Sequence, residues 1–146
     1  MANGGRKLDL ILNDIETNCE PSRYAAACLP FMVECASLIE SELPRIAFES
    51  LQTAKSYLRQ EAGTVSVQQA LSECWRELDK KKRTTSFDDP EVCAIRAVIC
   101  ILHDQVHSEP DDLVDRMSNF LEILNGVVPR EAEQESLLRL YFSGCI

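Results

Sequence analysis

Apolar residues recur along the chain with helical spacing. Near the start of the chain they stand at positions i, i+3, i+4 and i+7, which are Leu8, Ile11, Leu12 and Ile15, with Asp9, Asn13 and Asp14 outside this set. This spacing places the four side chains on one face of an α-helix. The same period returns in the later stretches, and no stretch shows the period of two that is typical of a half-buried β-strand. The pattern predicts an all-α fold.

Prolines divide this pattern into about seven segments. Pro44, Pro90, Pro110 and Pro129 each stand where a helical stretch opens, and proline fits the first turn of a helix. Pro30 lies inside the second stretch and predicts a kink or a division of that helix. We therefore expect a single helical domain over residues 1–146, folded as a compact orthogonal bundle of about seven helices.

Two segments carry more specific expectations. Residues 66–69 read Ser-Val-Gln-Gln, which is typical of a capping box at the start of a helix, and the helix that follows is expected to bury Trp75. The run from Ala94 to Leu102 is interrupted only by Arg96. A helix with so few polar positions is buried on most sides, so this segment is the expected centre of the bundle.

The spacing and neighbours of the seven cysteines indicate whether the protein is in a reducing or an oxidising compartment. They are Cys19, Cys28, Cys35, Cys74, Cys93, Cys100 and Cys145. The pairs 28/35 and 93/100 are each seven residues apart, close to two helical turns of about 10.8 Å, which is too far for a disulfide. Their apolar neighbours indicate buried, inert thiols in a reducing cytosol, with one or two disulfides as the alternative. No targeting segment or membrane-spanning run is visible, so we expect a cytoplasmic protein that does not enter a membrane.

One short motif suggests catalysis. His103 and His107 are four residues apart with Asp104 between them, a spacing that puts both imidazoles on one helix face, as in zinc hydrolases. Glu122 is the third ligand that we can suggest. The other interpretation is two solvent-facing histidines at the negative end of a helix. The chain has no nucleophile elbow and no glycine-rich phosphate loop. We therefore expect no catalytic residues, no bound metal, no cofactor and no enzymatic activity.

The charge is concentrated in one part of the chain. The formal net charge is −9, and residues 88–135 alone hold 12 acidic and 3 basic residues. Carboxylates at helix starts explain part of this excess, because they stabilise the helix dipole. The remainder predicts an acidic face that attracts a basic protein and repels nucleic acid. The candidate contact residues, which follow one another with no cation between them, are Asp104, Glu109, Asp111, Asp112 and Asp115.

Residues 23–71 carry a recognisable series of motifs. Residues 23–35 read RYAAACLPFMVEC, residues 45–61 read RIAFESLQTAKSYLRQE, and residues 64–70 read TVSVQQA. The series resembles small all-helical immunity proteins encoded beside bacterial polymorphic toxins, and a weaker similarity follows at residues 89–102. The match covers about a third of the chain. The resemblance implies a cytosolic inhibitor that blocks one cognate toxin by binding it, and it implies no catalytic residues.

Together these features favour an immunity or inhibitor protein that occludes the site of a basic toxin domain. Two other classes stay open. One is a metal-dependent hydrolase that uses His103, Asp104 and His107. The other is a structural adaptor module, for which a homodimer through an exposed apolar helix face is the expected form.

Overall fold

The computed structural model describes residues 2–81, 89–107 and 113–146, and in these ranges the chain is helical without any strand. The elements are α1 (Ala2–Asn18), α2 (Pro21–Ser37), the short 3-10 helix η1 (Glu40–Glu42), α3 (Arg45–Leu58), α4 (Thr64–Lys81), α5 (Pro90–Val106), α6 (Leu113–Asn125) and α7 (Glu131–Tyr141). The predicted fold class and the predicted number of helices are confirmed.

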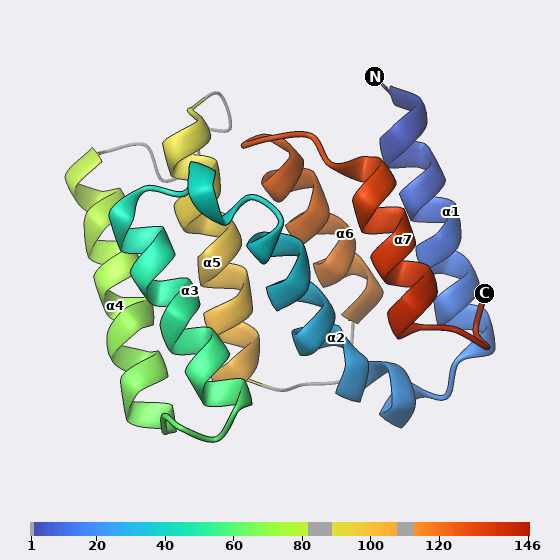
Figure 1. Ribbon diagram of the computed structural model, residues 1–146, viewed down its shortest axis with the longest axis horizontal. Helices are drawn as coiled ribbons and strands as arrows, with labels where there is room; N and C mark the ends of the chain where they lie inside the picture. Colours follow the sequence, from blue (N-terminus) through green and yellow to red (C-terminus); the bar gives the residue numbers. More distant parts are fainter. Residues whose placement is uncertain (1, 82–88, 108–112) are drawn as a thin grey trace.

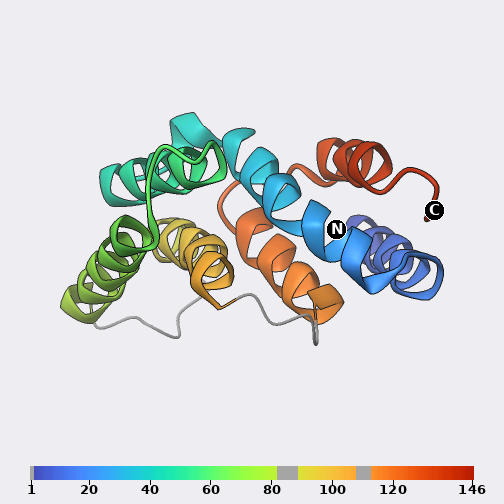
Figure 2. The same cartoon turned by 90° about the horizontal axis from the view of Figure 1, so that it is seen from below.

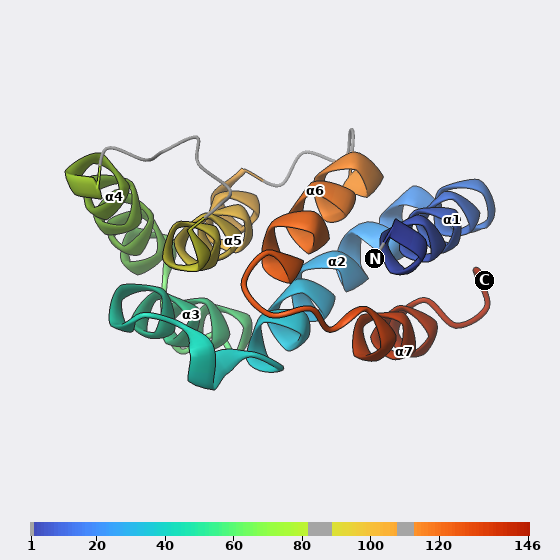
Figure 3. The same cartoon turned by 90° about the horizontal axis from the view of Figure 1, so that it is seen from above.

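The helices form two packed layers. Consecutive helices run in opposite directions (Figure 1), so the bundle is compact, as expected, but its helices have an up-and-down order in place of the orthogonal arrangement predicted from the sequence. Viewed from either end, α4, α5, α6 and α1 lie side by side in one layer, and α3, α2 and α7 form the other (Figures 2 and 3). Helices α1 and α7 are neighbours, which brings the two ends of the chain to the same edge of the molecule.

Helix α5 occupies the centre, as its apolar run predicts. It packs against α2, α3, α4 and α6, and eleven of its seventeen residues are buried. Its start matches the sequence as well, because Pro90 opens the helix and the Asp89 carboxylate accepts a hydrogen bond from the backbone N–H of Glu91 at 2.9 Å. The stripe predicted for α1 is also buried, with Leu12 1% and Ile15 0% exposed.

The local backbone conformation determines where α3 ends, where α4 begins and whether α2 is divided. Helix α3 ends at Leu58 because Gln60 adopts a left-handed conformation (φ 62°), and the N–H groups of Gln60 and Glu61 then bond back to the last turn. Helix α4 begins at Thr64, so Ser66 already lies inside its first turn, and the predicted capping box is wrong. Helix α2 continues through Pro30 without a division.

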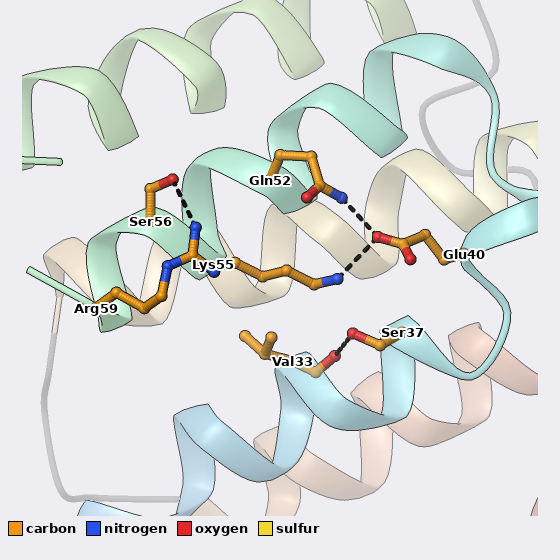
Figure 4. Close-up of polar contacts among 7 residues, drawn as sticks. All are labelled: Val33, Ser37, Glu40, Gln52, Lys55, Ser56 and Arg59. Carbon is orange, nitrogen blue, oxygen red and sulfur yellow. Dashed lines mark hydrogen bonds and ion pairs between the residues drawn. The ribbon is translucent and has the colours of Figure 1, made fainter. Parts of the chain in front are cut away.

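A polar cluster ties the connection after α2 to α3 (Figure 4). The Glu40 carboxylate accepts hydrogen bonds from Lys55 Nζ at 2.8 Å and from Gln52 Nε2 at 2.5 Å. Hydrogen bonding by Lys55 and then by Gln52 lowers the pKa of Glu40 below its ordinary value. The cluster therefore fixes η1 against the middle of α3.

The Glu40 cluster predicts a pH dependence of stability. The folded-state pKa lies below the unfolded one, so its stabilising effect is complete above about pH 4.3, the ordinary value for glutamate, and is lost as pH falls further. Replacing Glu40 with Gln should lower the free energy of unfolding by about 0.5–1 kcal/mol at pH 7, because the site is partly screened by solvent. Urea unfolding at pH 7 and at pH 3 measures this. An equal deficit at both pH values would contradict it.

A disulfide joins the end of α1 to the segment after α7. Cys19 and Cys145 are bonded, with Cα atoms 5.0 Å apart. The remaining described cysteines are free, and all but Cys100 are fully buried. The expectation of seven free thiols is thus wrong for two of them, because the distance along the chain does not limit which residues the fold brings together. The alternative of a disulfide is the one found.

Candidate functional site

An open pocket lies on the outer side of the layer formed by α4, α5 and α6. Its volume is about 230 Å³. Helix α4 contributes Trp75, and the other lining residues come from α5 and α6. The lining residues are Trp75, Arg96, Ile99, Cys100, His103, Asp104, Arg116, Asn119 and Ile123. This is a concave site lined by apolar side chains and several polar groups, a combination that is common in binding sites.

Asp104 and Arg116 form an ion pair in the pocket. Asp104 is 8% exposed, and its Oδ1 accepts a hydrogen bond from Arg116 Nη1 at 2.9 Å. His103 Nδ1 lies 3.5 Å from the same oxygen. The Asp104–Arg116 ion pair joins α5 to α6, and Arg116 is the partner that the buried carboxylate requires. Asp104 is therefore part of the wall of the pocket, and the prediction that it belongs to an exposed acidic surface is wrong.

Trp75 is the main residue that sequence reasoning misplaced. It was expected in the core, but 43% of it is exposed and its indole forms one wall of the pocket. Helix α4 lies at the edge of its layer, so only a narrow face carrying Val67, Cys74 and Leu78 is fully buried. The strongly polar sequence around Trp75 could have indicated its exposure, because a helix with few apolar positions buries only a narrow stripe.

Cys100 is present in the pocket as a neutral thiol. Burial, and after it the negative charge of Asp104, raise its pKa to about 11. A thiolate is the nucleophilic form of cysteine, and a pKa this high keeps the thiol protonated at neutral pH. Cys100 is therefore not poised as a nucleophile at neutral pH.

A second surface is formed by α1 and α6. Ser118 Oγ of α6 donates a hydrogen bond to Asp9 Oδ1 of α1 at 2.9 Å, which places these two helices side by side. Asp115 and Glu122 lie on the same side of α6 as Ser118, three residues before and four after it, and Glu16 follows Asp9 by two turns. We call Asp9, Glu16, Asp115 and Glu122 the acidic face. All four are exposed, and none of them forms an ion pair within the part of the chain that the structure describes.

The two predicted contact residues that the structure describes lie in different surroundings. Asp115 lies on the acidic face, whereas Asp104 is buried in the pocket wall. Glu109, Asp111 and Asp112 lie outside the described residues. Asp9 and Glu16 were not predicted, because they are about a hundred residues away from Asp115 in the sequence and only the packing of α1 on α6 brings them together.

The two histidines of the suggested metal motif are neighbours at the end of α5. Their ring centroids are 4.6 Å apart, and His103 is about half exposed. Within residues 2–81, 89–107 and 113–146, no group of three or more potential ligands is placed to hold a metal ion, and Glu122 does not join the histidines. The metal-dependent hydrolase stays an alternative that these residues alone do not complete.

Comparisons with known proteins give no relative. No family model, no curated protein and no solved structure matches the chain. None of the described helices has both the length and the apolar content needed to cross a bilayer. The similarity to immunity proteins therefore stays a prediction from the sequence.

Proposed function

We propose that this protein is a binding protein that inhibits a basic partner protein, with a bacterial toxin domain as the expected partner, and that it acts without catalysis of its own. The acidic face carries the proposal. Four exposed carboxylates stand on two adjoining helices without a described cation to neutralise them. Like charges placed together do not help a chain to fold, but they accelerate and orient the association with a cationic surface.

We include a cytoplasmic location of the protein in the same proposal. An inhibitor that protects the producing cell meets its toxin inside that cell. The four fully buried free thiols fit a reducing compartment, whereas the Cys19–Cys145 disulfide fits an oxidising one. The homodimer and the adaptor module remain the competing forms of a binding protein, and sedimentation of the purified chain at micromolar concentration distinguishes the dimer.

Charge reversal on the acidic face should weaken the complex. We expect Asp115→Lys with Glu122→Lys to lower the affinity for the basic partner by about 10- to 100-fold at low salt, and to reduce its salt dependence. The matched control reverses two exposed carboxylates of α4, Glu73→Lys with Asp79→Lys, which changes the net charge equally. That control should lower the affinity by less than about threefold, since long-range attraction is screened.

The partner is identified with the same variants. Wild-type protein and both double variants are immobilised, and native lysate is applied at low and at high salt. The proposal expects a basic protein that wild type and the α4 control retain, that the α6 variant loses, and that salt releases. Co-expression of that protein with the wild-type chain should restore growth if it is a toxin. The proposal fails if all three baits retain the same proteins, or if the retained partner is acidic.

A further inference from the structure

The two histidines of the chain stand together at the end of α5. His103 lies in the last turn of the helix, and His107 is the C-cap that follows Val106. The backbone N–H of His107 donates a hydrogen bond to the carbonyl oxygen of His103 at 2.8 Å, so the turn between the two residues is closed. Both side chains therefore lie on the same side of the helix end, with their ring centroids 4.6 Å apart.

The distance between the two rings suits a shared metal ion. A histidine nitrogen binds a transition metal at about 2.0–2.1 Å, and two imidazoles bound to one ion at right or tetrahedral angles then have ring centroids roughly 4.5–5.2 Å apart. The observed centroid distance of 4.6 Å lies in this range. Both side chains are exposed, so a small rotation can direct one nitrogen of each ring at the same ion.

Asp104 orients one of the two rings. Its Oδ1 lies 3.5 Å from His103 Nδ1, and Arg116 Nη1 donates a hydrogen bond to the same oxygen at 2.9 Å, which fixes the carboxylate. A carboxylate on this side of an imidazole favours the tautomer that carries the proton on Nδ1, and the lone pair of Nε2 is then free for a ligand. A carboxylate in this position is a usual companion of a metal-binding histidine.

The position of the pair also favours a cation. The last turn of a helix has carbonyl groups without intrahelical partners, and they form the negative end of the helix dipole. The chain has a formal net charge of −9, so a divalent cation is attracted to the protein as a whole. Imidazole nitrogen suits Zn²⁺, Ni²⁺ and Cu²⁺, whereas Mg²⁺ prefers oxygen ligands.

We propose that His103 and His107 together bind one divalent transition-metal ion, such as Zn²⁺, through one ring nitrogen each. Water completes the coordination, as it does in zinc sites that keep an open position. The site performs no reaction, which distinguishes it from the metal-dependent hydrolase. It departs from the expectation that no metal is bound, because that expectation was drawn without the positions of the two rings. The acidic face takes no part in it, so this inference goes beyond the proposed function and can fail without affecting it.

A Zn²⁺ titration of the untagged chain tests the site. The chain has two histidines, so a 15N-labelled sample gives two sets of imidazole signals, and coordination is observed at the bound nitrogens themselves. We expect both rings to shift together and to saturate at one ion per chain. The expected Kd is about 1–200 µM, because two protein ligands supply half of the ligand set of a structural zinc site. The proposal fails if the shift does not saturate by about 1 mM Zn²⁺, or if only one ring shifts.

Single substitutions show whether the two rings act together. His103→Asn and His107→Asn should each weaken Zn²⁺ binding by about tenfold or more, because the second imidazole no longer benefits from its high effective concentration. Both side chains are exposed, so we expect both variants to fold. The matched control is Glu73→Gln with Asp79→Asn on α4, which removes two exposed carboxylates and should change the affinity by less than about twofold. Unchanged affinity in the histidine variants would assign the metal to other groups and contradict the proposal.

Competition with Mg²⁺ separates imidazole ligands from carboxylates. A large excess of Mg²⁺ should leave the Zn²⁺-induced shifts of the two rings in place, because Mg²⁺ binds imidazole poorly and carboxylate oxygen well. Loss of these shifts on addition of Mg²⁺ would mean that carboxylates hold the ion, and it would overturn the histidine site.

Discussion

Replacing Phe31 with alanine is expected to lower the free energy of unfolding by about 3–5 kcal/mol. Phe31 is fully buried on α2, and its ring makes edge contacts with Tyr141 and Phe142, at centroid distances of 6.2 Å and 5.8 Å. Truncation removes the transfer free energy of the ring, leaves a cavity between α2 and α7, and abolishes both aromatic pairs, each of which contributes about 0.5–1.5 kcal/mol. Urea unfolding monitored by circular dichroism measures the loss.

The chain provides a matched control for this substitution. Phe48 on α3 is 40% exposed, so Phe48→Ala removes the same atoms from a surface position. We expect that change to lower the free energy of unfolding by less than about 1 kcal/mol. Similar losses for the two variants would mean that the packing of α2 on α7 is not the stabilising contact described above.

The period of apolar residues predicted most of the fold because burial along a helix is a local property. The apolar stripe of α1 predicted its buried face, and the nearly continuous apolar run of α5 predicted a helix buried on most sides. The structure confirms both predictions. The helix ends were less predictable. Gln60 adopts a positive φ although it is not a glycine, and this conformation ends α3 at Leu58.

The candidate sites depended on contacts between helices, which no local pattern contains. Asp104 looked like one member of an acidic run, but Arg116 lies one helix away and holds it in the pocket wall. Trp75 looked like a core residue, but α4 is at the edge of its layer and leaves it half exposed. Asp9 joins the acidic face because α1 packs against α6, where Ser118 donates a hydrogen bond to it. In each case the packing between helices decides where the residue lies.

Breaking the Cys19–Cys145 disulfide is expected to lower the free energy of unfolding by about 2–5 kcal/mol. The two cysteines are 126 residues apart, so the bond closes nearly the whole chain into one loop. In the chain-entropy account, such a loop restricts the unfolded ensemble by about 4–5 kcal/mol, and measured losses for native disulfides lie at or below this value. We would compare urea unfolding of the wild-type protein with and without a phosphine reductant.

The folded state should change little on reduction, because other bonds hold the same segment. Arg23 Nη2 donates to the Ser143 carbonyl at 2.7 Å, Asn18 Nδ2 donates to the Cys145 carbonyl at 3.2 Å, and Phe142 is fully buried. The loss therefore arises mainly in the unfolded state, which becomes less compact. We expect the denaturant m-value to rise on reduction, since more surface is exposed on unfolding.

A double variant separates this bond from the other thiols. Cys19→Ala with Cys145→Ala should unfold at the midpoint of the reduced wild-type protein, and reductant should not shift it further. An equal shift by reductant in the double variant would assign the effect to the remaining cysteines and contradict the prediction. The comparison also bears on the compartment, because a cytosol keeps such bonds reduced. A chain that still unfolds cooperatively with reductant present has the stability that a cytoplasmic inhibitor needs, whereas one that unfolds on reduction requires an oxidising compartment.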